Sequence, residues 1–167
     1  MFGNLIYVAL RFEWRFSVGA VAATVHDAII VLGVFSVFQL DFDLNVLASV
    51  LTVVGYSLND TIVIFDRVRE NFRKVRKGTP LQIMNQSVNE TMSRTIITAG
   101  TVFLVVIALY LFGGETLRGF SLALLVGLVS GTWSTIYIAS NVAILLGVSP
   151  ANLAVPKKEG EGAGAQV

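Results

Sequence analysis

The stretch LNVLASVLTVVGYSLNDTIVIF, residues 44–65, decides the fold class. A helix needs about 20 apolar residues to cross the roughly 30 Å hydrocarbon core of a bilayer. This stretch supplies them around a single carboxylate, Asp60. A shorter apolar run, Phe2–Leu10, cannot span alone. Three further runs are long enough: Phe16–Leu40, Thr95–Phe112 and Gly119–Val148. We therefore predict an all-α fold, a polytopic transmembrane helix bundle.

The composition excludes several classes of protein. Of the 167 residues, 54% are hydrophobic and 14% are charged, against about a quarter charged in an ordinary soluble domain, so a soluble enzyme is excluded. The net charge of +1 provides no basic field for a nucleic-acid backbone. The chain has no cysteine and one histidine, which excludes thiolate and multi-histidine metal sites. We expect neither a metal nor a cofactor.

The basic residues predict the orientation in the membrane. Counting loops alternately, eleven Lys and Arg residues fall on one side and only Arg118 on the other. The positive-inside rule places the rich side, with the 66–94 connection and the C-terminal end, in the cytoplasm. Phe2–Leu10 would then start outside, without the basic region of a secretory signal. We expect the chain to be the C-terminal part of a longer protein, with the bundle at residues 1–148.

The polar segments predict two further features. Thr79 can cap a helix and Pro80 suits its first position. Apolar residues follow at helical spacing, which predicts an amphipathic helix near residues 80–93 on the cytoplasmic face. Residues 149–167 are rich in Gly, Ala, Lys and Glu, and we expect a disordered cytoplasmic tail. The basic run 67–77 is interpreted as a topology anchor near anionic lipid.

Asp60 is the first candidate functional residue. A carboxylate at bilayer depth costs several kcal/mol, so it is by default a functional hypothesis. Asn59 precedes it on the same broad polar face of the helix and is also an ion-coupling candidate. Arg94 heads the next span at a similar depth. Burial would raise the pKa of this carboxylate, and a nearby guanidinium would lower it. The balance between the two would let Asp60 gain and lose a proton as its neighbours move. The alternative is that Arg94 reaches lipid headgroups and Asp60 only provides hydrogen bonds between helices.

His26 and Asp27 form a second candidate pair near the middle of the first full span. Adjacent helical residues point about 100° apart and do not face each other. Either both take part in ion coupling, or one of them is simply packed.

The run GYSLNDTIVIFDRVRENFRK, Gly55–Lys74, resembles the signature of the SecF family, the smaller membrane subunits of SecD–SecF protein-export complexes. This family is related to the resistance-nodulation-division transporters. A polar motif of this length inside a membrane span is more specific than hydropathy, and the resemblance covers about residues 5 to 147. The other matching segments, in the same order, are FEWR (12–15), HD (26–27), SRT (93–95), LFGG (111–114) and GF (119–120).

The resemblance implies six transmembrane helices, of which the five apolar runs would be the second to the sixth. The first helix and a large periplasmic domain would be absent from this chain. The family's functional carboxylate falls on Asp60 in the fourth helix, and its essential arginine falls on Arg94 at the fifth. A partner carboxylate would belong to SecD.

The implied function is that of an accessory subunit of the Sec translocon in the bacterial inner membrane. The complex would use a proton or sodium gradient to move its periplasmic domain and pull preproteins out of the SecYEG channel. No covalent chemistry is implied, so the chain is not expected to be an enzyme. A passive scaffold that stabilises SecD and the channel is the alternative. A small-molecule efflux half-transporter ranks lower, because no substrate path is visible in the runs.

Overall fold

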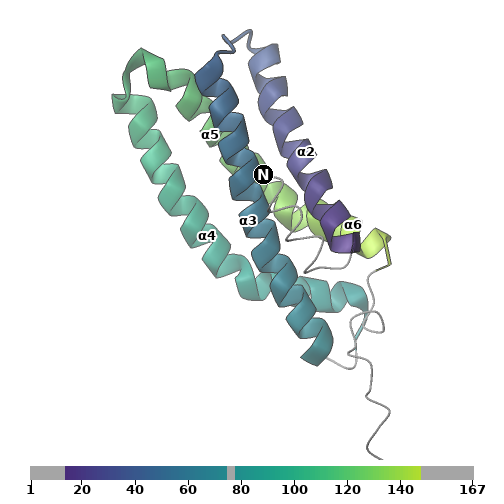
Figure 1. Cartoon of the computed structure of the whole chain (residues 1–167). Helices are drawn as coiled ribbons and strands as arrows, with labels where there is room; N and C mark the ends of the chain where they lie inside the picture. The colour runs from purple at the N-terminus through teal and green to yellow at the C-terminus, as the bar shows by residue number, and fades with distance from the viewer. Residues whose placement is uncertain (1–13, 75–77, 148–167) are drawn as a thin grey trace, which may run out of the picture.

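The computed structural model describes residues 14–74 and 78–147, and all regular elements among them are helical. Figure 1 shows long helices packed lengthwise into one bundle, which confirms the predicted all-α class. The expected run Phe2–Leu10 and the expected tail 149–167 lie outside the described residues. The elements are α2 (Trp14–Val37), α3 (Leu44–Lys74), α4 (Pro80–Phe112), α5 (Gly114–Ser134), the π-helix η1 (Thr135–Ala139) and α6 (Ser140–Leu145).

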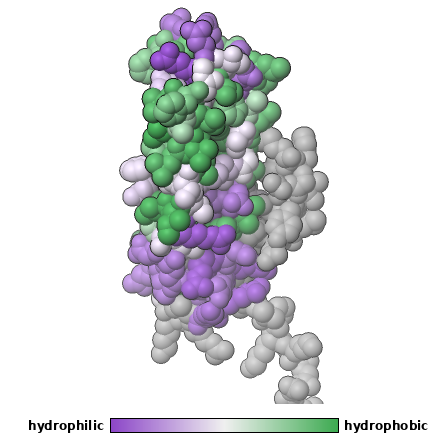
Figure 2. Space-filling view, turned by 90° about the vertical axis from the view of Figure 1, so that its left-hand side faces the viewer, coloured by the Kyte–Doolittle hydropathy of each residue, from purple (hydrophilic) through white to green (hydrophobic). Residues whose placement is uncertain are grey.

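Four helical segments among the described residues are long and apolar enough to cross a membrane. They correspond to the four full-length runs of the sequence. Figure 2 shows an apolar band on one face of the molecule, with hydrophilic residues above and below it. Large apolar side chains such as Ile97, Leu104 and Val105 are exposed on α4, as expected of a surface whose solvent is lipid.

α3 and α4 continue well beyond their apolar stretches. α3 runs on to Lys74, and α4 begins at Pro80, so the expected helix near 80–93 and the span 95–112 form one continuous helix. Thr79 caps α4: its hydroxyl accepts from the Gln82 amide, and the Gln82 side chain accepts from the Thr79 amide. In Figure 1 the first turns of α4 run in a different direction from the rest of the helix and pass the lower end of α3.

α3 is the central helix and packs against α2, α4 and α5. The largest apolar cluster gathers where α2, α3, the start of α4 and the last helical segments meet. Within it, the rings of Phe16 and Phe65 lie 4.9 Å apart between centroids. The core therefore holds the helix that carries Asp60 on several sides.

Two glycines allow backbones to approach closely in this core. A Cβ at Gly19 would lie 2.8 Å from the carbonyl oxygen of Ala139, at the end of η1. A Cβ at Gly127 would overlap the side chain of Val53. Small residues at helix contacts are typical of membrane bundles, because they let the backbones pack tightly.

Candidate functional site

Asp60 lies on the buried side of α3 and is 7% exposed. Its Oδ1 atom accepts a hydrogen bond from Thr95 Oγ1 of α4 at 3.2 Å. Its Oδ2 atom is buried and has no hydrogen-bond partner among the described residues. A buried acceptor without a partner is rare and needs an explanation, such as an ion or a group that moves. Asp60 therefore has one oxygen available for a further ligand.

Arg94, the expected partner of Asp60, does not form the expected ion pair with it. Its side chain is exposed, and the ion pairs of the described residues do not join it to Asp60. Thr95 makes the contact instead, because consecutive side chains on a helix point about 100° apart and only one of the two can face α3. Arg94 instead lines a groove of about 730 Å³ together with Arg67 and Glu90.

Asn59, the neighbour of Asp60, faces outward. It is exposed, as is Gly55 one turn earlier, and the space around Gly55 is open. The structure thus separates these two neighbours, with Asp60 turned into the bundle and Asn59 turned out of it. Lipid cannot provide hydrogen bonds to an amide, so this outer face suits another protein surface or water.

Asp27 occupies a second buried polar position and is fully shielded from solvent. Its Oδ2 atom accepts from Ser57 Oγ of α3 at 2.6 Å and from Ser134 Oγ of α5 at 2.8 Å. Its Oδ1 atom lies 3.2 Å from Nδ1 of His26, so the tips of these adjacent side chains meet although their helix positions diverge. Asp27 thereby links three helices, and all of its oxygens are used.

Hydroxyl groups continue this polar interior. Thr61 and Thr135 lie 3.2 Å apart between their Oγ1 atoms. Both Ser134 and Thr135 donate to the carbonyl oxygen of Gly131. Sequence reasoning did not select these hydroxyls as site residues. The signal that could have found them is the three- and four-residue spacing that places Gly131, Ser134 and Thr135 on one side of the helix.

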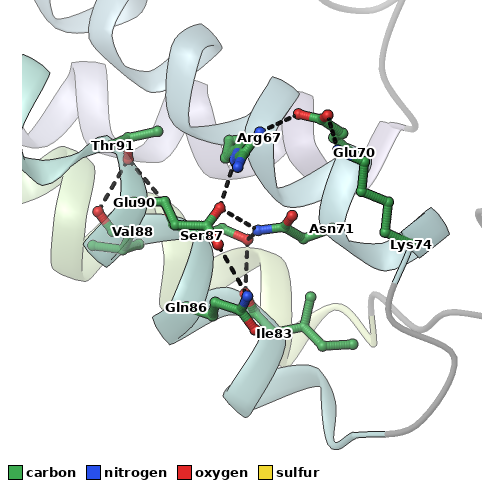
Figure 3. Close-up of polar contacts among 10 residues, drawn as sticks. All are labelled: Arg67, Glu70, Asn71, Lys74, Ile83, Gln86, Ser87, Val88, Glu90 and Thr91. Atoms are coloured by element: carbon green, nitrogen blue, oxygen red, sulfur yellow. Dashed lines mark hydrogen bonds and ion pairs between the residues drawn. The ribbon is translucent and has the colours of Figure 1, made fainter.

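A further polar network joins α3 to the first part of α4 (Figure 3). We call Arg67, Asn71, Ser87 and Glu90 the α3–α4 network. Glu90 Oε2 accepts from Arg67 Nε at 2.5 Å and from Asn71 Nδ2 at 2.9 Å. Asn71 Nδ2 also donates to Ser87 Oγ at 2.9 Å. Arg67 pairs in addition with Glu70 of its own helix.

The fold and these sites together define a multi-spanning helical membrane protein with two carboxylates buried inside its spans. Within the described ranges, no group of three His, Cys, Asp or Glu side chains could hold a metal ion. The chain belongs to the family described as protein export membrane protein SecD/SecF, C-terminal, which matches residues 1–149. The resemblance drawn from the Gly55–Lys74 run is therefore confirmed.

Individual relatives agree with this assignment. The chain is 57% identical over 159 residues to protein translocase subunit SecF of Vibrio alginolyticus, covering 95% of this chain and 50% of the relative. It is 52% identical over 159 residues to the same subunit of Escherichia coli O157:H7, covering 95% of this chain and 49% of the relative. The chain thus spans about half the length of the curated relatives it matches.

A solved structure shares the fold. The crystal structure of SecDF in its super-membrane-facing form superposes with a TM-score of 0.82 at 44% sequence identity. The match covers 85% of this chain and 19% of that one.

Proposed function

We propose that this chain is the ion-coupling membrane part of an accessory subunit of the Sec translocon. In this role it helps to drive preprotein export across the bacterial inner membrane. The family assignment supports the export role. The single observation that carries the ion coupling is Asp60, a carboxylate inside a membrane span with one oxygen hydrogen-bonded and the other without a partner.

The coupling step is exchange of an ion at Asp60. A proton or a sodium ion binds the free Oδ2 atom and removes the uncompensated charge from the membrane interior, which lowers the cost of burial. When the ion leaves, the guanidinium of Arg94 is the nearest basic group on α4 that can replace it, one residue from the Thr95 contact. Movement of Arg94 between its groove and Asp60 then converts ion release into movement of α4 against α3.

The proposed partners rest on the exposed polar face of α3 and on the family assignment. SecD pairs with the outer face of α3 around Asn59, where lipid leaves polar groups unsatisfied. The SecYEG channel and the preprotein are reached through a periplasmic domain outside this chain. The 66–94 connection and the C-terminal tail lie in the cytoplasm, as the positive-inside rule requires.

A passive scaffold remains the second candidate, and Asp27 is the observation that favours it. Its hydrogen bonds tie α2, α3 and α5 together, and His26 occupies its other oxygen. A carboxylate with both oxygens engaged is well suited to holding helices in place. In the ion-coupling proposal, the His26–Asp27 pair takes part as the second acidic position along the ion path.

The test uses the complete SecD-containing complex in proteoliposomes with the channel. Asp60→Asn keeps the size of the side chain and abolishes its titration, so it is expected to assemble and to lose ion-gradient-driven export. Arg94→Lys is also expected to be defective, because lysine lacks the planar fork that contacts a carboxylate at two points. Asp41→Asn, at an exposed carboxylate, is the matched control and should export normally.

Proton flux and sodium flux, measured separately in the same vesicles, identify the ion. Normal ion-driven export by an assembled Asp60→Asn complex would eliminate the coupling role and leave the scaffold.

A further inference from the structure

Three contacts between α3 and α4 lie one after another along the two helices. Asp60 meets Thr95, Arg67 meets Glu90, and Asn71 meets Ser87. As the residue number rises along α3 it falls along α4, so the helices are antiparallel and the contacts form consecutive pairs. The α3–α4 network therefore lies in register with the candidate ion site, about two helical turns away on α3.

The network is built from specific and partly buried contacts. Asn71 is 3% exposed and Ser87 is fully buried. Glu90 receives three donors, because Gln86 Nε2 also donates to its Oε1 atom at 2.9 Å. Glu90 is exposed, but loss of Glu90 or Ser87 leaves the buried Asn71 amide with one partner fewer, which makes its contacts sensitive to displacement. Figure 3 shows Asn71 directed between Ser87 and Glu90.

The membrane part of α4 packs against α5, but few of its side chains are buried. Of the buried residues of α4, all but Val106 lie between Ile83 and Thr95. Beyond Thr95, large side chains such as Ile97 and Leu104 are exposed. Most of the buried side chains that α4 brings to the bundle therefore lie in its first half, where the network lies.

We propose that Asn71 and Glu90 are positioning residues for the ion site at Asp60. They hold α4 at one axial position, and this position brings the Thr95 hydroxyl to Asp60 and keeps Arg94 within reach. This inference rests on the proposed ion coupling. It also changes the interpretation of the basic run, because Arg67 is engaged by Glu90 and contributes a helix contact in addition to charge.

The geometry shows how sensitive the Thr95–Asp60 contact is to a shift of α4 along its axis. A slip of α4 by one residue moves its side chains by about 1.5 Å along the axis. The Thr95–Asp60 contact is already 3.2 Å long, near the upper limit for a hydroxyl hydrogen bond. A slip of this size breaks it, and the ion affinity of Asp60 changes with it.

The experiment measures the ion concentration at half-maximal export in the complete complex. Asn71→Ala and Glu90→Gln are each expected to shift this midpoint by about threefold or more, which corresponds to part of the free energy of one hydrogen bond at the site. Both variants should still assemble into the complex. Lys74→Gln is the matched control, since the Lys74–Glu70 pair stays within α3. It should leave the midpoint unchanged.

A covalent replacement of the network separates positioning from stability. The chain has no native cysteine, so Asn71→Cys with Ser87→Cys provides one cross-link across the network. The oxidised form should show the wild-type midpoint for ion binding at Asp60, and reduction of the same sample should shift it. Ion binding is measured here in place of export, because a cross-link from α3 to α4 prevents the movement that export requires.

A merely structural role predicts less assembled complex and lower maximal export at an unchanged midpoint, and that result overturns the inference. Equal midpoints in the oxidised and reduced forms overturn it as well. If the wild-type complex shows no ion dependence, it is the proposed coupling that fails.

Discussion

The contact between α5 and α3 at Gly127 allows a prediction about the stability of the bundle. A Cβ added at Gly127 would lie 2.6 Å from Val53 Cγ1 and 2.9 Å from Val53 Cβ. Ordinary carbon–carbon contacts are about 3.5 Å or longer. Rotation about χ1 of Val53 moves its methyl groups but leaves its Cβ in place. The helices must therefore separate by about 0.6 Å or more to reach ordinary contact.

Gly127→Ala should destabilise the bundle by about 1–3 kcal/mol, the usual range for overpacking. The measurement is the unfolding free energy in mixed micelles. Gly100→Ala is the matched control, because the space around Gly100 is open and both changes gain the same helix propensity. Adding Val53→Ala to Gly127→Ala removes the two methyl groups and should recover part of the loss. If Gly127→Ala is as well tolerated as Gly100→Ala, the inferred close packing of α3 and α5 is wrong.

Three further changes test individual contacts. Ser134→Ala removes one donor from Asp27 and should lower the unfolding free energy by about 1–2 kcal/mol; an unchanged transition would contradict the buried contact. Thr95→Val keeps the shape of the side chain but removes the donor to Asp60, and should shift the ion midpoint of export by about fivefold, whereas an unshifted midpoint argues against this contact in the working complex. Thr79→Ala removes the cap of α4 and should cost about 1 kcal/mol locally, seen as faster amide exchange in its first turn; equal exchange rates would refute the capping role.

The fold class could be predicted from hydropathy, because a helix that spans a bilayer needs an apolar run of a minimum length. An apolar run such as Leu44–Phe65 predicts a membrane-spanning helix, and the structure contains a helix there. Hydropathy could not show that α3 continues to Lys74, because the extension is mostly charged and polar. It is held by the buried side chains of Val68 and Phe72 and by polar contacts with α4. The π-helix Thr135–Ala139 was also missed, since hydropathy does not distinguish a π-helical turn from an α-helical one.

The two buried carboxylates were found because charge is conspicuous in an apolar stretch. Their hydroxyl partners were not found, because serine and threonine are common in membrane helices and each carries little information. The choice between Arg94 and Thr95 as the residue nearest Asp60 depends on the rotation of α4 about its axis. Charge complementarity favoured Arg94, whereas the structure turns Thr95 inward and leaves Arg94 exposed.

The two carboxylates differ in how much rearrangement a change of charge would require. Three side chains from α2, α3 and α5 surround Asp27, so a change there would disturb contacts in three helices. Asp60 has one hydroxyl contact, and that contact comes from α4, whose membrane part beyond Thr95 buries only Val106. Because interactions that are few and local give way at the lowest free energy, the proposed change of charge at Asp60 is expected to affect its contact with α4 first. The arrangement therefore suits Asp27 to holding the bundle together and Asp60 to moving one helix of it.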